Sequence, residues 1–253
     1  MKVQKGKEFW MSVNNISKVT KLINEKRKVD KNIYTSNIQT FIVLDFNLTK
    51  EQNLMLLKNV LKNTKLFELF GYIINDMYKF DFINTSSVDA SIQSNNYNTN
   101  DLDLLEGINL LEHSFGVVNQ MNSKIDKSYG QVFDFYLLAA LVHDFGKNPQ
   151  LRNNYFLSSE KGHHKASAEY LEQKRDELSE SFGKFELDMI NLVIEAVRVH
   201  HDNLNISIKI PNNLSSIVDK IDNNELQNII LKFLKESDIS QREIELKKIN
   251  SLK

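Results

Sequence analysis

The stretch Ala139-Ala-Leu-Val-His143-Asp144-Phe-Gly-Lys147 decides the fold expected for this chain. It ends a segment, residues 132–145, that is almost wholly apolar from residue 135 to residue 142, as is typical of a central helix buried on all sides. Gly146 and Pro149 predict that this helix stops at the His-Asp pair. A plain interpretation is a histidine that interacts favourably with the helix dipole. However, a carboxylate beside so buried a helix is costly unless it is paired or bound to a metal.

The histidines of the chain are confined to one window around this stretch. There are six, and none lies before residue 113 or after residue 201: His113, His143, His163, His164, His200 and His201. Imidazole and carboxylate groups together suit divalent transition metals such as Mn, Fe, Ni or Zn. Because the segments that carry them have helical patterns, the sequence predicts a metal site built inside a helical bundle. The chain has no cysteine, which excludes disulfides, a thiolate zinc site and a cysteine nucleophile.

The order of these residues resembles the HD superfamily of metal-dependent phosphohydrolases, from about Leu104 to about Asp222. Around the central motif stand four others: Leu-Leu-Glu-His113-Ser, His163-His-Lys-Ala-Ser-Ala-Glu-Tyr-Leu171, Val-His200-His201-Asp and Ile-Val-Asp219-Lys-Ile-Asp222. The chain is most similar to the paired-histidine variant, the core of the HD-GYP members. It lacks their Gly-Tyr-Pro element, because Asp-Asn-Leu-Asn follows the paired histidines, which argues against a standard cyclic-di-GMP enzyme.

The resemblance implies a set of metal ligands. They are His113, His143, Asp144, His163, His200, His201 and Asp219. Within the family pattern Asp144 would bridge two metal ions, for which Fe or Mn is favoured over Ni or Zn.

Three of these assignments have alternatives. Adjacent helical side chains point about 100° apart, so His200 and His201 reach one metal only if their helix ends there. If the helix continues, one of them is a ligand, the other faces solvent, and the site holds one ion in place of two. The register of the third motif favours His163 as the ligand and leaves His164 as a helix-start or substrate residue. Asp219 fits the closing motif, and Asp222 would then support the helix or the ligands.

The resemblance also implies an activity. The expected protein is a phosphohydrolase that cleaves a phosphomonoester or phosphodiester, of a nucleotide or a nucleic-acid end, with a metal-activated water. Asp144 and Lys147 would be its catalytic residues. Lys147 would contact the phosphate, although a lysine that completes a helix dipole is the plainer interpretation, and Arg198 is a further candidate for substrate contact. The alternative is an HD-type binding or regulatory module, associated with nucleic acid in the DNA-processing system of a mobile element.

The composition bears on partners and location. A net charge of −1 offers no general attraction to nucleic acid or to an anionic membrane, so the expected partner is a phosphorylated small molecule or nucleotide. Basic residues near the N-terminus make a nucleic-acid contact possible, although a solvated helix face is the favoured interpretation: Lys2, Lys5, Lys7, Lys18, Lys21, Lys26, Arg27, Lys28 and Lys31. No apolar run reaches the roughly 18 to 20 residues of a membrane span, and no signal peptide is recognisable, so a cytoplasmic protein is expected.

The expected fold is mainly α, an HD-domain helical bundle with a small N-terminal α+β appendage. Residues 1–100 would form the appendage and its polar linker, 101–225 the metal-binding bundle, and 226–253 a helical tail on the bundle or on another subunit. In the appendage, Thr40–Leu48 and Met77–Ile83 are predicted strands. Thr49 starts a helix between them, with Gln52 at capping-box spacing. In the bundle, residues 166–178 and 187–199 are predicted helices.

Overall fold

Helix α6, Phe133–Val142, lies at the centre of the structure, and all of its residues are buried. The structure is a computed structural model that describes residues 42–88, 104–125, 130, 132–158, 162–202 and 222–251. Within the described residues, the main contacts of α6 are with α3 (Thr64–Lys79), α5 (Leu110–Lys124), α8 (His163–Glu177), α9 (Lys184–Arg198) and α10 (Asn223–Asn250). The prediction of a central helix buried on all sides is therefore confirmed.

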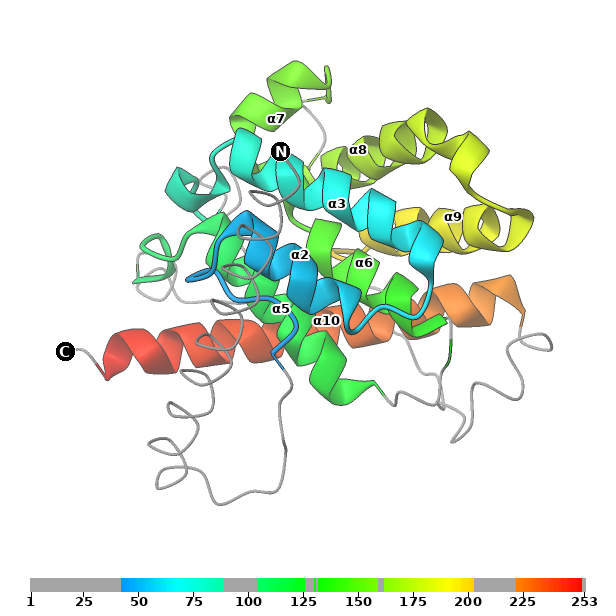
Figure 1. Ribbon diagram of the computed structural model, residues 1–253. Helices are drawn as coiled ribbons and strands as arrows, with labels where there is room; N and C mark the ends of the chain where they lie inside the picture. The colour runs from blue at the N-terminus through cyan, green and yellow to red at the C-terminus, as the bar shows by residue number, and fades with distance from the viewer. Residues whose placement is uncertain are drawn as a thin grey trace, which may run out of the picture. The chain divides into compact units, whose positions relative to one another are not determined.

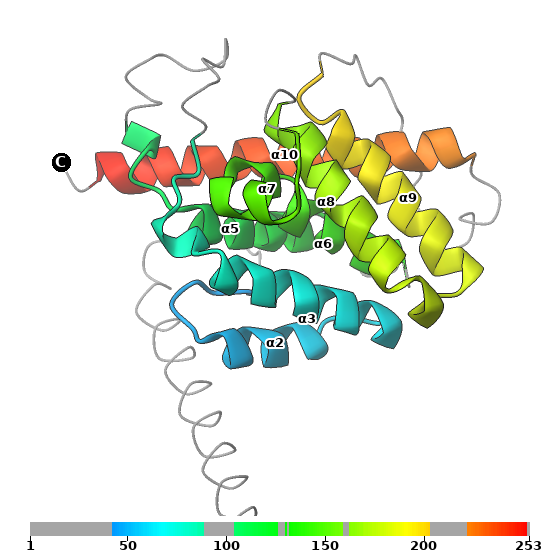
Figure 2. The same ribbon diagram turned by 90° about the horizontal axis from the view of Figure 1, so that it is seen from above.

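The helices surround α6 in layers (Figures 1 and 2). In Figure 2, α5 and α6 lie between the long helix α10 on one side and the pair α2 (Lys50–Lys58) and α3 on the other. Helices α8 and α9 pack against each other and flank this arrangement. The short elements are the helix α7 (Pro149–Asn154) and the 3₁₀ turns η1 (Phe82–Asn84), η3 (Phe145–Lys147) and η4 (Ser179–Ser181).

Local signals in the sequence explain where several helices start. Thr49 and Gln52 form the predicted capping box at the start of α2. Asn109 caps α5 by accepting a hydrogen bond from the N–H of Glu112, and Asn148 caps α7, in which Pro149 is the first residue. The mainly helical fold class is confirmed, and so are helices over the two bundle segments expected at residues 166–178 and 187–199.

The prediction of a strand at Met77–Ile83 is wrong. The residues belong to the end of α3, which continues to Lys79, and to the turn η1. Buried residues of α3 recur at helical spacing, and Ile73, Ile74 and Met77 are among them. The alternation of aromatic residues after Met77 suggested a strand, but the longer helical period governs this segment.

The predicted strand at Thr40–Leu48 is also absent over residues 42–48, the described part of that segment. Here the backbone pairs with a side chain and not with a strand. The N–H groups of Val43 and Leu44 donate to Oδ1 of Asn119, and Nδ2 of Asn119 donates to the carbonyl of Leu44. One amide on α5 thus supplies the hydrogen bonds that a neighbouring strand would have provided. Residues 42–88, the described part of the predicted α+β appendage, are helical and irregular, apart from an isolated β-bridge between Ser86 and Asn109.

One hydrophobic core joins this N-terminal part to the bundle. Phe70, Ile73 and Phe82 belong to the same buried cluster as residues of α5, α6 and α10. Helix α10, expected as a tail, packs on α5, α6 and α9 within the bundle. The division of the chain near residues 100 and 225 stays a prediction, as does an oligomer formed through α10. In the described parts of the chain, no helix has the length and apolar character needed to cross a membrane.

Candidate metal centre

Four segments bring six of the predicted ligands together at one place, and a fifth adds a carboxylate that the sequence analysis did not single out. Helix α5 carries His113, the end of α6 carries His143 and Asp144, and α8 begins with His163. His200 and His201 follow the end of α9, and α10 contributes Asp238. Two groups of possible metal-binding atoms result: Asp144, His163, His200 and His201 form one, and His113, His143 and Asp238 form the other.

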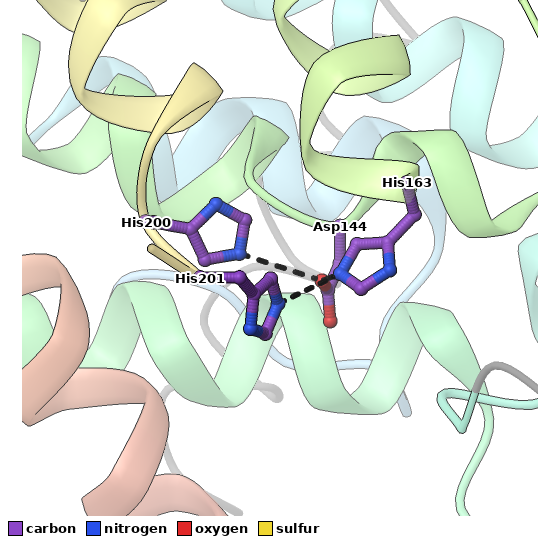
Figure 3. Close-up of side chains that lie close together, drawn as sticks. All are labelled: Asp144, His163, His200 and His201. Atoms are coloured by element: carbon purple, nitrogen blue, oxygen red, sulfur yellow. Dashed lines mark hydrogen bonds and ion pairs between the residues drawn. The ribbon is translucent and has the colours of Figure 1, made fainter. Parts of the chain in front are cut away.

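The carboxylate of Asp144 lies between the two groups. Its Oδ1 is 3.2 Å from Nε2 of His163 and 4.0 Å from Nε2 of His200. Its Oδ2 is 3.3 Å from Nε2 of His113 and 3.4 Å from Nε2 of His143. Figure 3 shows the imidazoles of the first group gathered around this carboxylate. Each oxygen of Asp144 therefore faces a different set of donors.

The second group is completed by Asp238. Its Oδ1 is 3.2 Å from Nε2 of His113 and 4.0 Å from Nε2 of His143. Two ligands about 2.1 Å from one ion, at octahedral or tetrahedral angles, are separated by about 3.0–3.4 Å. The shorter separations in both groups fall in or near that range, so the spacing is that of ligands around a shared ion.

The end of α9 lets two adjacent histidines face one point. The helix ends at Arg198, and the N–H of His200 bonds to the carbonyl of Val197 in a tighter turn. His200 is buried whereas His201 is exposed, yet both belong to the group around Asp144. The sequence-based condition that the helix must end here is met. Nε2 of His201 also lies 2.8 Å from Nε2 of His163.

Hydrogen bonds at the second ring nitrogen orient three of these imidazoles. Nδ1 of His143 lies 2.8 Å from the carbonyl of Ala140, and Nδ1 of His200 lies 2.7 Å from that of Val197. Nδ1 of His113 lies 2.9 Å from a carboxylate oxygen of Glu245. Because carbonyl and carboxylate oxygens only accept, each Nδ1 carries the proton, and Nε2 is left to bind a metal.

Five of the atoms that face the shared space form no hydrogen bonds within the described residues. They are buried nevertheless: Nε2 of His113, His143 and His200, Oδ1 of Asp144 and Oδ1 of Asp238. Leaving buried polar atoms without partners is costly, and a bound ion is one accepted explanation for such a cluster. The residues thus fit divalent metal ions held by nitrogen and oxygen ligands.

The electrostatics of the cluster keep its acidic groups ionised. Burial opposes the charge on Asp144, but His143, Lys147 and His113 hold the pKa of its carboxyl well below the usual range. Burial likewise opposes the charge on Asp238, and its neighbours His113 and His143 lower the pKa of that carboxyl. Ionised carboxylates are the form that binds metal.

The histidines differ in how readily they shed a proton. Desolvation and then the charge of His201 hold the pKa of His200 well below 6.5. Desolvation and then the charge of His163 lower the pKa of His201 to about 4. At His113, burial and Arg242 oppose protonation, but Glu245, Asp144 and Asp238 outweigh them and raise its pKa to about 9. His200 and His201 are therefore neutral at pH 7, the state that binds metal.

Lys147 and Arg242 place two cations beside Asp144. Nζ of Lys147 donates to Oδ2 of Asp144 at 2.6 Å and to the carbonyl of Ser87 at 2.8 Å. Nη2 of Arg242 donates to the same carbonyl and lies 3.9 Å from Asp144 Oδ2. One buried peptide group before the bundle therefore holds both cations at the centre. Phosphate contact by Lys147 stays a prediction.

The other predicted residues have different surroundings. His164 belongs to neither group, and its ring centroid is 5.5 Å from that of His201. Arg198 pairs with Glu172 at 3.2 Å and with Glu195 at 3.3 Å. Asp222 is the exposed N-cap of α10, and Asp219 lies outside the described residues. The roles assigned to these four stay predictions.

The sequence analysis missed Asp238 and Glu245. Both lie on α10, which was interpreted only as a charged amphipathic tail. A signal existed, since Asp238, Gln241 and Glu245 continue at helical spacing the buried stripe that contains Leu231 and Leu234. Charged residues that extend an apolar stripe indicate buried partners elsewhere in the fold.

The comparison with known protein families agrees with this geometry. The family model of the HD domain matches residues 110–249, more than half of the chain, so the chain belongs to the HD-domain family. HD domains bind divalent metals, and the family consists in general of metal-dependent phosphohydrolases. The matched region includes nearly all of the helix α10 and ends beyond Glu245. No curated protein and no solved structure matches the chain significantly.

Proposed function

We propose that this chain is a phosphohydrolase with two divalent metal ions, acting on a phosphomonoester or phosphodiester of a nucleotide or a nucleic-acid end. The observation that carries the proposal is the position of Asp144, whose two oxygens face separate groups of donors. If only one ion were bound, one of these two groups of residues would have no ion to bind. Bound ions would supply an activated water as nucleophile and would polarise the phosphoryl group.

The residues of the chain divide the remaining work. His163, His200 and His201 would hold one ion, and His113, His143 and Asp238 the other, with Asp144 shared. The ammonium of Lys147, which bonds to Asp144, would offset negative charge on the phosphoryl oxygens. Because two of its three N–H groups already bond to Asp144 and Ser87, one donor remains for a substrate.

Exposure indicates the side from which a substrate would approach. His113, His143, Asp144, His163 and His200 are all buried. His201 is exposed, and 22% of the Asp238 side chain is exposed. The substrate would therefore meet the centre where these two residues reach solvent. His164, next to His201, would lie along that approach.

The test combines metal content with phosphate release. Protein purified without oxygen and reloaded with Mn²⁺ or Fe²⁺ is expected to hold about two ions per chain and to release phosphate from members of a panel of phosphomonoesters and phosphodiesters. Asp144→Asn removes the shared carboxylate and should lower metal-dependent turnover by at least about 100-fold. Asp188→Asn, in an exposed ion pair with Lys184 on α9, is the matched control.

Three outcomes would count against the proposal. Failure to bind any metal after reloading would exclude a metal-dependent enzyme, and turnover that survives Asp144→Asn would exclude this site. Metal binding without turnover on any substrate would favour the alternative, an HD-type binding or regulatory module. In that case salt-sensitive binding to DNA, weakened by neutralising Lys26, Arg27 and Lys28, would indicate a nucleic-acid partner.

A further inference from the structure

A buried polar network on α10 reaches the metal centre from behind His113. Glu245 is 1% exposed and lies on the face of α10 that packs against α5. Its Oε1 is 2.9 Å from Nδ1 of His113 and accepts from Nε2 of Gln241 at 3.0 Å. Its Oε2 accepts from Nη1 of Arg242 at 2.9 Å. The carboxylate is thus held on both oxygens, with one of them directed at the imidazole.

We propose that Glu245 is a positioning residue that makes the two metal positions unequal, by strengthening the one formed by His113, His143 and Asp238. The proposal rests on the two-metal function described above. It concerns a residue that would touch no metal ion and no substrate.

The three oriented imidazoles have different partners. His143 and His200 bond to neutral backbone carbonyls, from Ala140 and Val197, whereas His113 bonds to the carboxylate of Glu245. A carboxylate that accepts from Nδ1 holds the ring in one orientation and raises the basicity of Nε2 as a ligand. Among the oriented histidines of the described residues, this effect belongs to the His113 position alone.

The cost of burying Glu245 supports a functional interpretation. A buried carboxylate loses hydration free energy that its partners only partly restore, and an apolar side chain would often pack equally well. Arg242 offsets the charge of Glu245, and Arg242 is itself held by the carbonyl and hydroxyl oxygens of Ser87. Four polar residues that lie far apart in the sequence are therefore ordered to fix the imidazole of His113: Ser87, Gln241, Arg242 and Glu245.

The supporting residues come partly from outside the matched family region. Ser87 precedes that region, which begins at residue 110, and it is fully buried. Its N–H bonds to the carbonyl of Ile108, which fixes the peptide against the start of α5. The position of Glu245 is thus a property of this chain's own N-terminal part together with α10.

The experiment measures both metal affinities separately. Metal-free protein is titrated with Mn²⁺ alone, and bound ions are counted, for the natural chain and for Glu245→Gln. The natural chain should bind two ions, one more tightly than the other. In Glu245→Gln, which keeps the size but loses the charge, one affinity should fall by about 10- to 100-fold while the other stays within about threefold.

Two further variants keep the result interpretable. Glu245→Asp keeps the charge but withdraws it by one methylene, so it should also weaken one position, and it serves if Glu245→Gln does not fold. Glu112→Gln is the matched control, because Glu112 on α5 pairs with Lys248 on α10 and belongs to neither group of possible ligands. That variant should bind both ions as the natural chain does.

The outcomes separate this inference from the proposed function. If the natural chain binds two ions and the folded Glu245 variants bind both with unchanged affinity, Glu245 has no positioning role. If both affinities fall equally, Glu245 only maintains the fold, and the inference fails as well. If the natural chain itself binds no metal, the proposed function fails, and the inference falls with it.

Discussion

At the scale of single residues, the centre depends on how one carboxylate is shared. Asp144 lies beside His143 in the sequence, yet its two oxygens face histidines from α5, α8 and the end of α9. The pKa values of the surrounding groups then decide the competition between protons and metal ions. A proton competes with a metal ion at His113, whose pKa the nearby carboxylates raise to about 9 against burial and Arg242.

Metal binding is therefore expected to release a proton from His113. Below about pH 9 the metal-free protein carries that proton, and an ion bound at Nε2 must displace it. Affinity should rise with pH up to about 9 and then level off, whereas His201, with a pKa of about 4, adds no such dependence above pH 6.5. Isothermal titration at pH 7.5 in buffers of different ionisation enthalpy should detect about one proton per chain.

The same pKa shift affects the stability of the metal-free protein, with a definite sign. A raised folded-state pKa stabilises the fold fully below the unfolded value of 6.5, and this contribution is lost as pH rises through about 9. In the metal titration, a proton release that is absent at pH 7.5, or that persists in His113→Asn, would contradict the assignment of the released proton to His113.

The adjacent histidines His163 and His164 provide a matched pair. His163→Ala removes a donor 3.2 Å from Asp144 and should weaken one metal position by at least about 10-fold. His164→Ala removes a ring outside both groups and should leave metal affinity nearly unchanged. Metal titration of the two variants decides which histidine is the ligand, and the reverse result would make His164 the ligand.

At the scale of elements, the turn after α6 and the start of α8 must approach closely. Gly146 lies against the first residue of α8, so that a Cβ at this position would overlap the carbonyl oxygen of His163. The N–H of Gly146 donates to Oγ of Ser167, and that hydroxyl donates to the same carbonyl. The glycine after the His-Asp pair is therefore explained by backbone packing that positions His163, a candidate ligand.

Gly146→Ala should accordingly damage both the fold and the site. The backbone of α8 would have to move, which should cost roughly 1–3 kcal/mol of unfolding free energy and weaken the metal position that includes His163. Gly71→Ala, in the middle of α3 with open space around it, should instead stabilise by roughly 0.5–1 kcal/mol. Thermal unfolding and metal titration test both, and a neutral Gly146→Ala would contradict the close packing.

Elements also show where prediction from sequence failed. The start of α2 after Thr49 and the end of α6 both follow from capping and helix-breaking residues that act locally. The segment 42–48 has β-forming residues, but its backbone bonds to Asn119, which is distant in the sequence. A strand needs a partner strand, and no local pattern shows whether the fold will provide one.

At the scale of the whole molecule, the N-terminal helices and the bundle share one core. Phe82 on η1 packs edge-on against Phe145 at 4.8 Å, and Phe145 stacks on Tyr170 of α8 at the same centroid distance. Phe145 directly follows Asp144, so this aromatic cluster supports the turn that carries Asp144. Residues 42–251, where described, are expected to unfold as one cooperative unit.

Phe82→Ala tests this cooperativity. Removing the buried ring should lower the free energy of unfolding by roughly 3–5 kcal/mol. The whole protein should then melt at a lower temperature in a single transition. Ile83→Ala, at a neighbouring position that is 52% exposed, should change stability by no more than about 0.5 kcal/mol. Calorimetry with circular dichroism distinguishes the cases, and a separate low-temperature transition with an unchanged main transition would show that the N-terminal part folds on its own.

The sequence by itself determined the helical fold class, the buried central helix and the residue types of the candidate centre, because periodicity, breaking residues and motifs are visible along the chain before it folds. Only the tertiary structure decided that Asp238 lies with His113 and His143, and that Glu245 and Ser87 lie behind this candidate centre. His113 and Glu245 are 132 positions apart, and Ser87 and Arg242 are 155 apart. Such contacts depend on how helices pack around a common core, so they become visible only once the chain has folded.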